Sequence, residues 1–460
     1  MAQLFRAGET KIRPGVYYRY TGQNASGAAA LDGVNAIVIN ASWGPSGTVT
    51  VHETANSIKE TYGSGTGVEA ALMLKSAGAS KVYICRPAGS GGAKGTVELG
   101  GGTISAKYDG TRALTVKIQA KPGDATKKQA LILEGATMLE TFDFAASGSG
   151  EGTALSEVLA GSKYVTCTVS TSAEVTAGEY ALTGGKNPTM TAQDYLTGFQ
   201  ALEPYRYNVL STDSEDEAVA LVLQAYVEEA ELSGKLFIGV VGAPTSVAFE
   251  TRLAKAKAFN DKQIVYFGSG FTNVAGEIIN GVKAINYAAG VIAATPANQS
   301  IVRTAVTGAV DTTEKLTNAQ YEEAIRNGLL LLSIGPDGQI WFDSGVNTLV
   351  TPAGNEDDGW KKIKRTKTRI ELMDRIDRAV APLVGKVNCD ADGVAAVIQA
   401  GMGVITSMIA ERKLMAGATM TLDADNPYTA DSAWFVIQAD DIDTIEKLYL
   451  HYQFRYSQNV

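Results

Sequence analysis

Residues 207–241, YNVLSTDSEDEAVALVLQAYVEEAELSGKLFIGVV, contain the pattern that decides the fold. Two apolar runs, Tyr207–Leu210 and Lys235–Val241, are typical of buried strands. Between them, Ser214-x-x-Glu217 has the spacing of a capping box, and we expect a helix from there to Leu232. Neighbouring strands that are joined by a helix of this length pair in parallel. A parallel pair needs a long crossover connection, whereas a tight turn joins antiparallel strands. The stretch therefore predicts one unit of a parallel, helix-covered sheet.

The same alternation continues on both sides of this unit. The predicted strands are 35–40 and 81–86 before it and 263–267 after it, and the predicted helices are 66–77, 246–259 and 276–293. A hairpin is expected at 329–343, followed by two long helices at 367–384 and 391–413 and by strands at 433–438 and 445–456. This order predicts a doubly wound α/β sheet.

One segment has a different composition. From about Gly89 to Pro188 the chain is rich in Gly, Thr, Val and Ser, and short alternating runs are separated by turn signals such as Asp109-Gly110. Because the α/β alternation resumes afterwards, we interpret this segment as an inserted β-rich sandwich or barrel. The predicted organisation is an N-terminal arm and tether (1–30), a first core segment (31–88), the insertion (89–190), a second core segment (191–445) and a C-terminal strand arm (446–460).

Composition excludes several classes of protein. The chain has 460 residues, 45% of them hydrophobic, and a net charge of −9, so it is neither disordered nor a general nucleic-acid binder. Three widely spaced cysteines and two histidines predict no metal site and fit synthesis in a reducing compartment. The apolar stretch 394–410 is interrupted by Gln399 and is short for a membrane span, so we interpret it as a buried core helix.

No catalytic signature was found. The glycine-rich run Gly63–Gly67 lacks the G-x-G-x-x-G spacing and follows a helix, and no Walker or G-x-S-x-G motif is present. Asp213 follows a strand at the edge where α/β sheets bind ligands, but acids at a helix start are also explained by capping. We therefore expect no enzyme, no catalytic residues and no cofactor; the alternative is a nucleotide- or cofactor-binding α/β enzyme with a β-rich accessory domain.

Both ends of the chain have the pattern of a strand with one apolar and one mainly polar face. Near the C-terminus, apolar and mainly polar residues alternate and stop four residues before the end, and an N-terminal arm at 11–20 alternates similarly. Such strands are either edge strands of the core sheet or strands added to a neighbouring molecule, and two matching arms favour the second interpretation. The candidate interface residues are Ile12, Pro14, Val16, Tyr17, Tyr18 and Tyr20 in the N-terminal arm and Leu448, Leu450, Tyr452, Phe454 and Tyr456 in the C-terminal arm.

Two segments carry opposite charge. Residues 361–378 are mainly basic, whereas residues 423–446 contain seven acids and no base. These segments are either solvated faces or complementary contacts between copies. For the second case the candidate charged contacts are Lys361, Lys362, Lys364 and Arg365.

The chain resembles the contractile tail sheath proteins of phages and of the phage-tail-like bacteriocins of Gram-positive bacteria. The resemblance spans almost the whole chain and is carried by residues 13–17, 33–44, 341–349, 364–377 and 448–456. It implies a mixed α/β core made from both ends of the chain, an outward-facing insertion, and arms that pair with neighbouring subunits.

The resemblance also implies a mechanical function. Sheath subunits form stacked hexameric rings, a six-fold helical polymer around an inner tube, which contracts from a metastable extended state and drives the tube through a cell envelope. The implied partners are other copies of the chain, the inner tail tube protein, and baseplate and tail terminator proteins, with no nucleic acid and no membrane insertion. Such a protein is made in the bacterial cytoplasm and is mature in the tail of a virion or of an extracellular particle. A third possibility is a different self-assembling shell or surface-layer protein.

Overall fold

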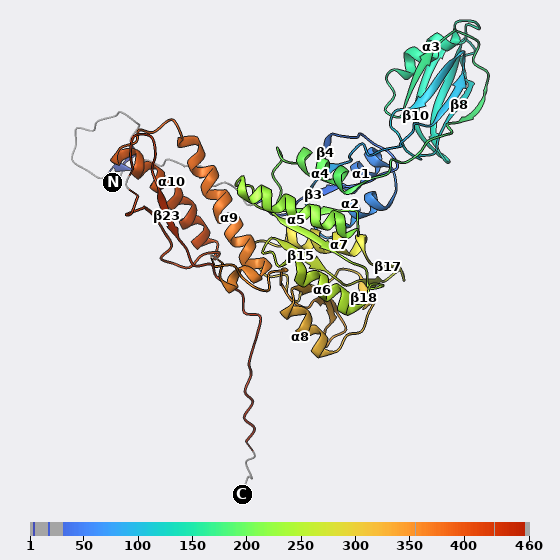
Figure 1. Cartoon of the computed structure of the whole chain (residues 1–460). Coiled ribbons are helices and arrows are strands. Elements are labelled where there is room, and N and C mark those ends of the chain that lie inside the picture. Colours follow the sequence, from blue (N-terminus) through green and yellow to red (C-terminus); the bar gives the residue numbers. More distant parts are fainter. Residues whose placement is uncertain (1–2, 5–16, 19–30, 355, 427, 456–460) are drawn as a thin grey trace.

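The computed structural model describes residues 3–4, 17–18, 31–354, 356–426 and 428–455 (Figure 1). Near the N-terminus it gives the main chain of two short strands, β1 (Gln3–Leu4) and β2 (Tyr17–Tyr18), which pair in parallel. The predicted N-terminal arm residues Ile12, Pro14, Val16 and Tyr20 lie outside the described residues.

A seven-stranded sheet forms the core. Its order is β19-β15-β14-β13-β3-β5-β4, and every neighbouring pair is parallel except β4 with β5. The strand β3 comes from the N-terminal part of the chain and lies inside the sheet, between β5 and β13. The strands are β3 (Val34–Val38), β4 (Val49–His52), β5 (Lys81–Cys85), β13 (Val209–Thr212), β14 (Ile238–Gly242), β15 (Ile264–Phe267) and β19 (Leu329–Leu330).

Helices cover both faces of this sheet, so the predicted mixed α/β fold is confirmed. The first face carries α1 (Ala55–Tyr62), α2 (Thr66–Ser76) and α7 (Val282–Ala294). The second carries α4 (Ala192–Ala201), α5 (Glu217–Leu232), α6 (Phe249–Phe259) and α8 (Asn318–Arg326). Each face has its own apolar cluster, because the strands direct alternate side chains to opposite sides.

The Ser-x-x-Glu spacing at Ser57–Glu60 and at Ser214–Glu217 predicts a helix start at each serine, and both starts are wrong by up to one turn. The N-cap of α1 is Thr54, whose hydroxyl accepts from the Ser57 amide at 3.2 Å, so Ser57 is already inside the helix. The N-cap of α5 is Asp216, whose carboxylate accepts from the Ala218 amide at 2.9 Å, so the helix does not start at Ser214. In both cases a neighbouring residue supplies a side-chain oxygen that satisfies a free helix amide, which the spacing of Ser and Glu alone does not reveal.

Residues 269–312 contain elements that the sequence pattern did not indicate. The helix predicted from residue 276 begins at Val282, and a small antiparallel sheet of β17, β16 and β18 precedes and follows it. Its strands are β16 (Phe271–Asn273), β17 (Ile278–Ile279) and β18 (Ala309–Thr312). These strands have only two to four residues, too few for a recognisable alternation.

The β-rich segment forms two antiparallel sheets with their own apolar core. One sheet has the order β10-β9-β8-β12 and the other β11-β7-β6, and they project from the core together with one helix (Figure 1). Their elements are β6 (Thr96–Leu99), β7 (Gly102–Ala106), β8 (Leu114–Ala120), β9 (Lys127–Glu134), β10 (Thr137–Ala145), α3 (Glu151–Leu159), β11 (Val165–Val169) and β12 (Gly178–Ala181). Trp43, from a loop of the core, completes this apolar cluster. The exact domain boundaries stay predictions.

The C-terminal region forms a further layer beside the core. The predicted hairpin is present as β20 (Leu332–Ile334) and β21 (Ile340–Phe342), and it leads to two helices and a two-stranded sheet. These are α9 (Ile363–Val380), α10 (Ala391–Ala410), β22 (Thr419–Leu422) and β23 (Phe435–Gln438), joined by a small apolar cluster of their own.

The helix α10 is long and apolar enough to cross a membrane by length and composition, and only 28% of its apolar window is buried. The interpretation as a buried core helix is therefore wrong for this chain taken alone. One side of α10, which includes Gly401, Ile405 and Met408, is buried against α9 and β22, and the other side faces outward. The high mean hydropathy of α10 comes from its many small and aliphatic residues, and it does not show that the helix is completely buried.

The last predicted strand, 445–456, is not formed within the single chain. From Asp441 to Arg455 the described residues contain one isolated bridge, between Asp441 and Leu414, and no regular strand. The segment leaves the C-terminal layer as an extended chain (Figure 1). A strand needs a second sheet edge to satisfy its main-chain groups, and none of the described residues supplies one here.

Candidate functional site

Residues 447–455, called the tail below, form an exposed segment that is rich in large apolar side chains. Every one of them is exposed, and no main-chain hydrogen bond joins them to another described residue. Their large apolar side chains are between 69% and 94% exposed: Leu448, Tyr449, Leu450, Tyr452 and Phe454. Single exposed apolar residues are common on protein surfaces, but a continuous group of them marks an interaction site.

The tail has the side-chain order of a strand that lacks its partner. In an extended chain alternate residues share a face, which places Leu448, Leu450, Tyr452 and Phe454 together. The rings of Tyr452 and Phe454 are stacked with their centroids 6.3 Å apart. The predicted interface residue Tyr456 lies outside the described residues, as do four of the six in the N-terminal arm.

The segment just before the tail, residues 439–446, is called the tail root below and lies against α9. Lys362 Nζ lies 2.6 Å from Asp443 Oδ2 and 2.9 Å from Glu446 Oε2. Arg365 and Arg369 both bind Asp441, with nitrogen–oxygen distances of 2.9 and 3.0 Å. Burial alone would raise the pKa of Asp441, but the hydrogen bonds from the two guanidinium groups outweigh it and lower that pKa.

The predicted charged contacts thus have different surroundings. Lys362 and Arg365 pair with the tail root of the same chain, whereas Lys361 pairs with Asp358 at 2.9 Å. Lys364 is buried, and its ammonium has no hydrogen-bond acceptor among the described residues. Desolvation lowers the pKa of Lys364, and the nearby Asp443 and Asp441 partly offset this. A contact of these charges between copies stays a prediction.

The acids of the tail root were missed as site residues. The opposite charge of segments 361–378 and 423–446 was the available signal, but charge alone does not reveal that the two segments pair within one chain. Because Arg365 and Asp441 are 76 residues apart, only the fold brings them together.

The crevice where a doubly wound sheet binds ligands is filled by protein groups. It lies beyond the carboxyl ends of β3 and β13, where the order of strands reverses. There Asp213 accepts hydrogen bonds from the Tyr195 hydroxyl at 2.6 Å and from the Asn40 amide at 2.7 Å. A side chain at Gly67, at the start of α2, would collide with Asp213. The carboxylate of Asp213 therefore lies in this crevice close to the start of α2 and is hydrogen-bonded by groups of the same chain.

Asp213 makes the stability of the fold depend on pH. Burial raises its pKa to about 6, more than the two hydrogen bonds lower it. The pKa of Asp213 is higher in the folded state than in the unfolded state. Its carboxyl group therefore stabilises the fold fully below about pH 4, and this contribution is lost as the pH rises through 6. We expect the unfolding free energy of Asp213→Asn, relative to the wild type, to increase by roughly 2.5 kcal/mol from pH 4 to pH 7. Urea unfolding of both chains over this range measures the difference.

The buried Asp261, whose pKa is also raised to about 6, is present in both chains, so its contribution cancels. Parallel pH profiles for the two chains would contradict the assignment of Asp213.

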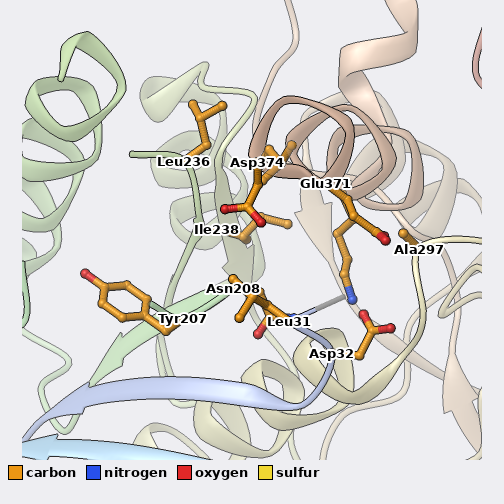
Figure 2. Close-up of a pocket in the computed structure, with 11 residues that line it drawn as sticks. Leu31, Asp32, Tyr207, Asn208, Leu236, Ile238, Ala297, Glu371 and Asp374 are labelled. Atoms are coloured by element: carbon orange, nitrogen blue, oxygen red, sulfur yellow. The ribbon is translucent and has the colours of Figure 1, made fainter. Parts of the chain in front are cut away.

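A cavity at the opposite, amino end of the sheet is too small for a substrate. Figure 2 shows the residues that line it, with Tyr207, Asn208 and Ile238 from the start of the sheet strands and Glu371 and Asp374 from α9. Its free volume of about 40 Å³ suits a few water molecules, whereas small-molecule pockets measure about 300 Å³ or more. Nearby, Lys367 donates to the Ile292 carbonyl at 2.6 Å and caps α7. Across the described residues no group of three His, Cys, Asp or Glu side chains could hold a metal ion.

Comparisons with known proteins show which proteins the chain is similar to. Residues 189–348 match the family model described as the phage tail sheath protein central domain. The chain is similar in structure to the sheath tail protein of Desulfitobacterium hafniense, with a TM-score of 0.74 and 19% identity over 93% of this chain and 100% of the other. For the sheath tail protein Lin1278 of Listeria innocua the TM-score is 0.69, with 18% identity over 89% and 95%. No curated protein matched the sequence.

More distant structures share the same fold. The helical sheath of the anti-feeding prophage in its contracted state has a TM-score of 0.52 and 12% identity over 97% of this chain and 99% of the other. The resemblance to contractile tail sheath proteins is thus confirmed: residues 189–348 match the tail sheath central domain, and the chain shares the fold of sheath tail proteins. These findings support a structural sheath subunit of a phage or phage-like tail particle and are consistent with a protein that is not an enzyme.

Proposed function

We propose that the chain is the repeating subunit of a contractile tail sheath, and that it polymerises as stacked hexameric rings around an inner tube by exchanging terminal strands. The observation that carries this proposal is the tail, because residues 447–455 present an apolar strand face with no partner in the described residues of their own chain. A second copy of the chain is the partner that such a strand fits, since main-chain hydrogen bonds give strength and the apolar face gives register.

The chain also has sheet edges that could accept a strand. The sheet of β22 and β23 has only two strands among the described residues, so each has an edge without a sheet neighbour, and Val436 and Ile437 of β23 are exposed. The edge strand β4 of the core sheet exposes Val51. An open edge of this kind is a template for another chain.

The proposed mechanism is mechanical and needs no nucleotide. Each subunit would be held by strands from two neighbours, so that every further contact is effectively intramolecular and the polymer gains avidity. The extended sheath would persist because of a kinetic barrier, and contraction would lower its free energy by forming new contacts between subunits while the exchanged strands act as hinges. The moving sheath would drive the tube through a cell envelope.

The proposed partners follow from this assembly. They are further copies of the chain, the inner tube protein, and the baseplate and terminator proteins at the two ends of the tail. Similar folds occur in baseplate and contracted-sheath structures of the anti-feeding prophage, which supports the first and third of these partners. The chain would be made in the bacterial cytoplasm before assembly.

Electron microscopy of the purified chain tests the proposal. We expect hollow tubes of stacked six-membered rings, because a self-complementary strand exchange continues from ring to ring. Closed shells or flat lattices would favour a shell or surface-layer protein instead. A chain that stays monomeric at high concentration and is strongly stabilised by nucleotides would favour the enzyme.

A further inference from the structure

The tail root is held on the molecule mainly by charge. Its main chain makes two hydrogen bonds to the segment after α10, from Met415 N to the Asp440 oxygen at 2.8 Å and from Ile442 N to the Lys413 oxygen at 3.0 Å. The other contacts are made by side chains, including a hydrogen bond from Ser300 Oγ to Glu446 at 3.0 Å. The root contains no helix and no strand, so little cooperative structure resists its detachment.

Six charged side chains form this attachment. Lys362 binds two acids of the root, Asp441 binds two bases of α9, and each pair lies within ion-pairing distance. The side chain of Asp441 is only 5% exposed, so its pairs are screened less by salt than surface pairs. The set is called the ionic latch below: Lys362, Arg365, Arg369, Asp441, Asp443 and Glu446.

Two features allow the latch to open. The ammonium of Lys364 is buried beside Asp441 and Asp443 without a hydrogen-bond acceptor among the described residues, which makes the closed state less favourable than the pairs alone suggest. A groove of about 690 Å³, lined by Ser300, Arg303 and Glu446 among others, also runs beside the root. The root therefore has space next to it that other side chains do not fill.

We propose that opening of the ionic latch lengthens the free tail by releasing residues 439–446 from the molecule. With the latch closed, the free tail begins at Lys447; with the latch open, residues 439–446 join it. Eight extended residues span at most about 26 Å at about 3.3 Å each. Opening the latch therefore lets a subunit move farther from the neighbour that holds its tail, by up to this length less the distance that the root already spans in the closed state. The role in assembly rests on the proposed strand exchange, whereas the latch itself is a property of the single chain.

Hydrogen exchange of the unassembled full-length chain tests the latch directly. In Asp443→Asn/Glu446→Gln, which removes both negative partners of Lys362, we expect faster exchange of the two amides that join the root to the segment after α10. These are Ile442, which donates to the Lys413 carbonyl, and Met415, which donates to the Asp440 carbonyl, and both should exchange at least tenfold faster than in the wild type at low salt. The control is Asp423→Asn/Asp425→Asn, which changes the charge equally in acids that form no ion pair with another described residue. The control is expected to exchange like the wild type.

A charge exchange separates the latch from a general loss of folding. Lys362→Glu alone should open the root, and Lys362→Glu/Asp443→Lys should restore at least some of its protection. Equal exchange of the Ile442 and Met415 amides in the wild type and in the opened variants would overturn the proposal. The same exchange increase spread over the whole chain would also overturn it, since the effect would then be unfolding.

A locked chain tests the lengthening of the tail in the polymer. Lys362→Cys/Asp443→Cys joined by a short bismaleimide should still form extended tubes but should contract less than the unjoined double variant. Full contraction with the latch joined would overturn the proposal while leaving strand exchange intact. Conversely, normal polymerisation of a chain without its tail would remove the proposed function and leave the single-chain exchange result standing.

Discussion

A chain that lacks residues 447–460 is expected to fold normally and to form no tubes. Every described residue of the tail is exposed, so its removal takes nothing from the apolar clusters, and the melting temperature should stay within about 1 °C of the wild type. The polymer, in contrast, loses the burial of four large apolar side chains, worth roughly 1.5–3 kcal/mol each, at every subunit contact. Circular dichroism measures the first effect and electron microscopy the second.

A matched pair of variants shows which face of the tail matters. Replacing Leu448, Leu450, Tyr452 and Phe454 by Ser should abolish tubes as the deletion does, because the apolar face gives the strand its register. Replacing Lys447 and Gln453 by Ser, on the other face, should leave tubes intact. Normal tubes from the truncated chain would show that the tail does not join subunits.

The second large effect is expected in the joint between the core and the β-rich segment. Arg86 at the end of β5 is completely buried and donates to the carbonyl oxygens of Ala41 and Gly44 at 3.1 and 3.0 Å. Its only ion pair among the described residues is with Asp109 of the β-rich segment, at 3.1 Å. Asp109→Ala leaves a buried guanidinium without its counter-charge, and we expect a loss of about 3–5 kcal/mol in unfolding free energy.

Urea or thermal unfolding measures this loss, with Glu179→Gln as the control. Glu179 pairs with Lys117 at 2.8 Å on the exposed surface of the same segment, where an ion pair contributes about 0–1 kcal/mol. A loss below about 1 kcal/mol for Asp109→Ala would mean that water or another group compensates Arg86.

Much of the fold follows from local patterns. The apolar runs at 35–40, 81–86 and 263–267 are strands of one sheet, and the helix predicted at 66–77 is α2. The capping boxes that begin at Thr191 and Thr317 start α4 and α8 as their spacing indicates. These features depend on residues a few positions apart, which compete little with the rest of the fold. The short strands of residues 271–273 and 309–312 depend instead on one another across 36 to 41 positions, and no local pattern reveals them.

For the candidate site, too, some features follow from local sequence patterns and others depend on the tertiary structure. The tail was recognised in the sequence, since alternation over nine residues is a local property. The predicted strand is absent from the single chain because its hydrogen-bond partner must come from elsewhere. The role of Asp213 and the pairing of Arg365 with Asp441 required coordinates, because each joins residues from distant regions of the chain.

The amino-acid sequence by itself determined an acidic chain with a helix-covered parallel sheet, a β-rich segment and a C-terminal segment that alternates apolar and polar residues, because apolar periodicity and capping act over one or two turns. Only the tertiary structure decided that the ligand crevice is filled by Asp213 and that the basic face of α9 is occupied by the acids of the tail root. Ion pairs and buried hydrogen bonds act over a few ångströms, so residues 76 or 173 positions apart can interact only after the chain has folded.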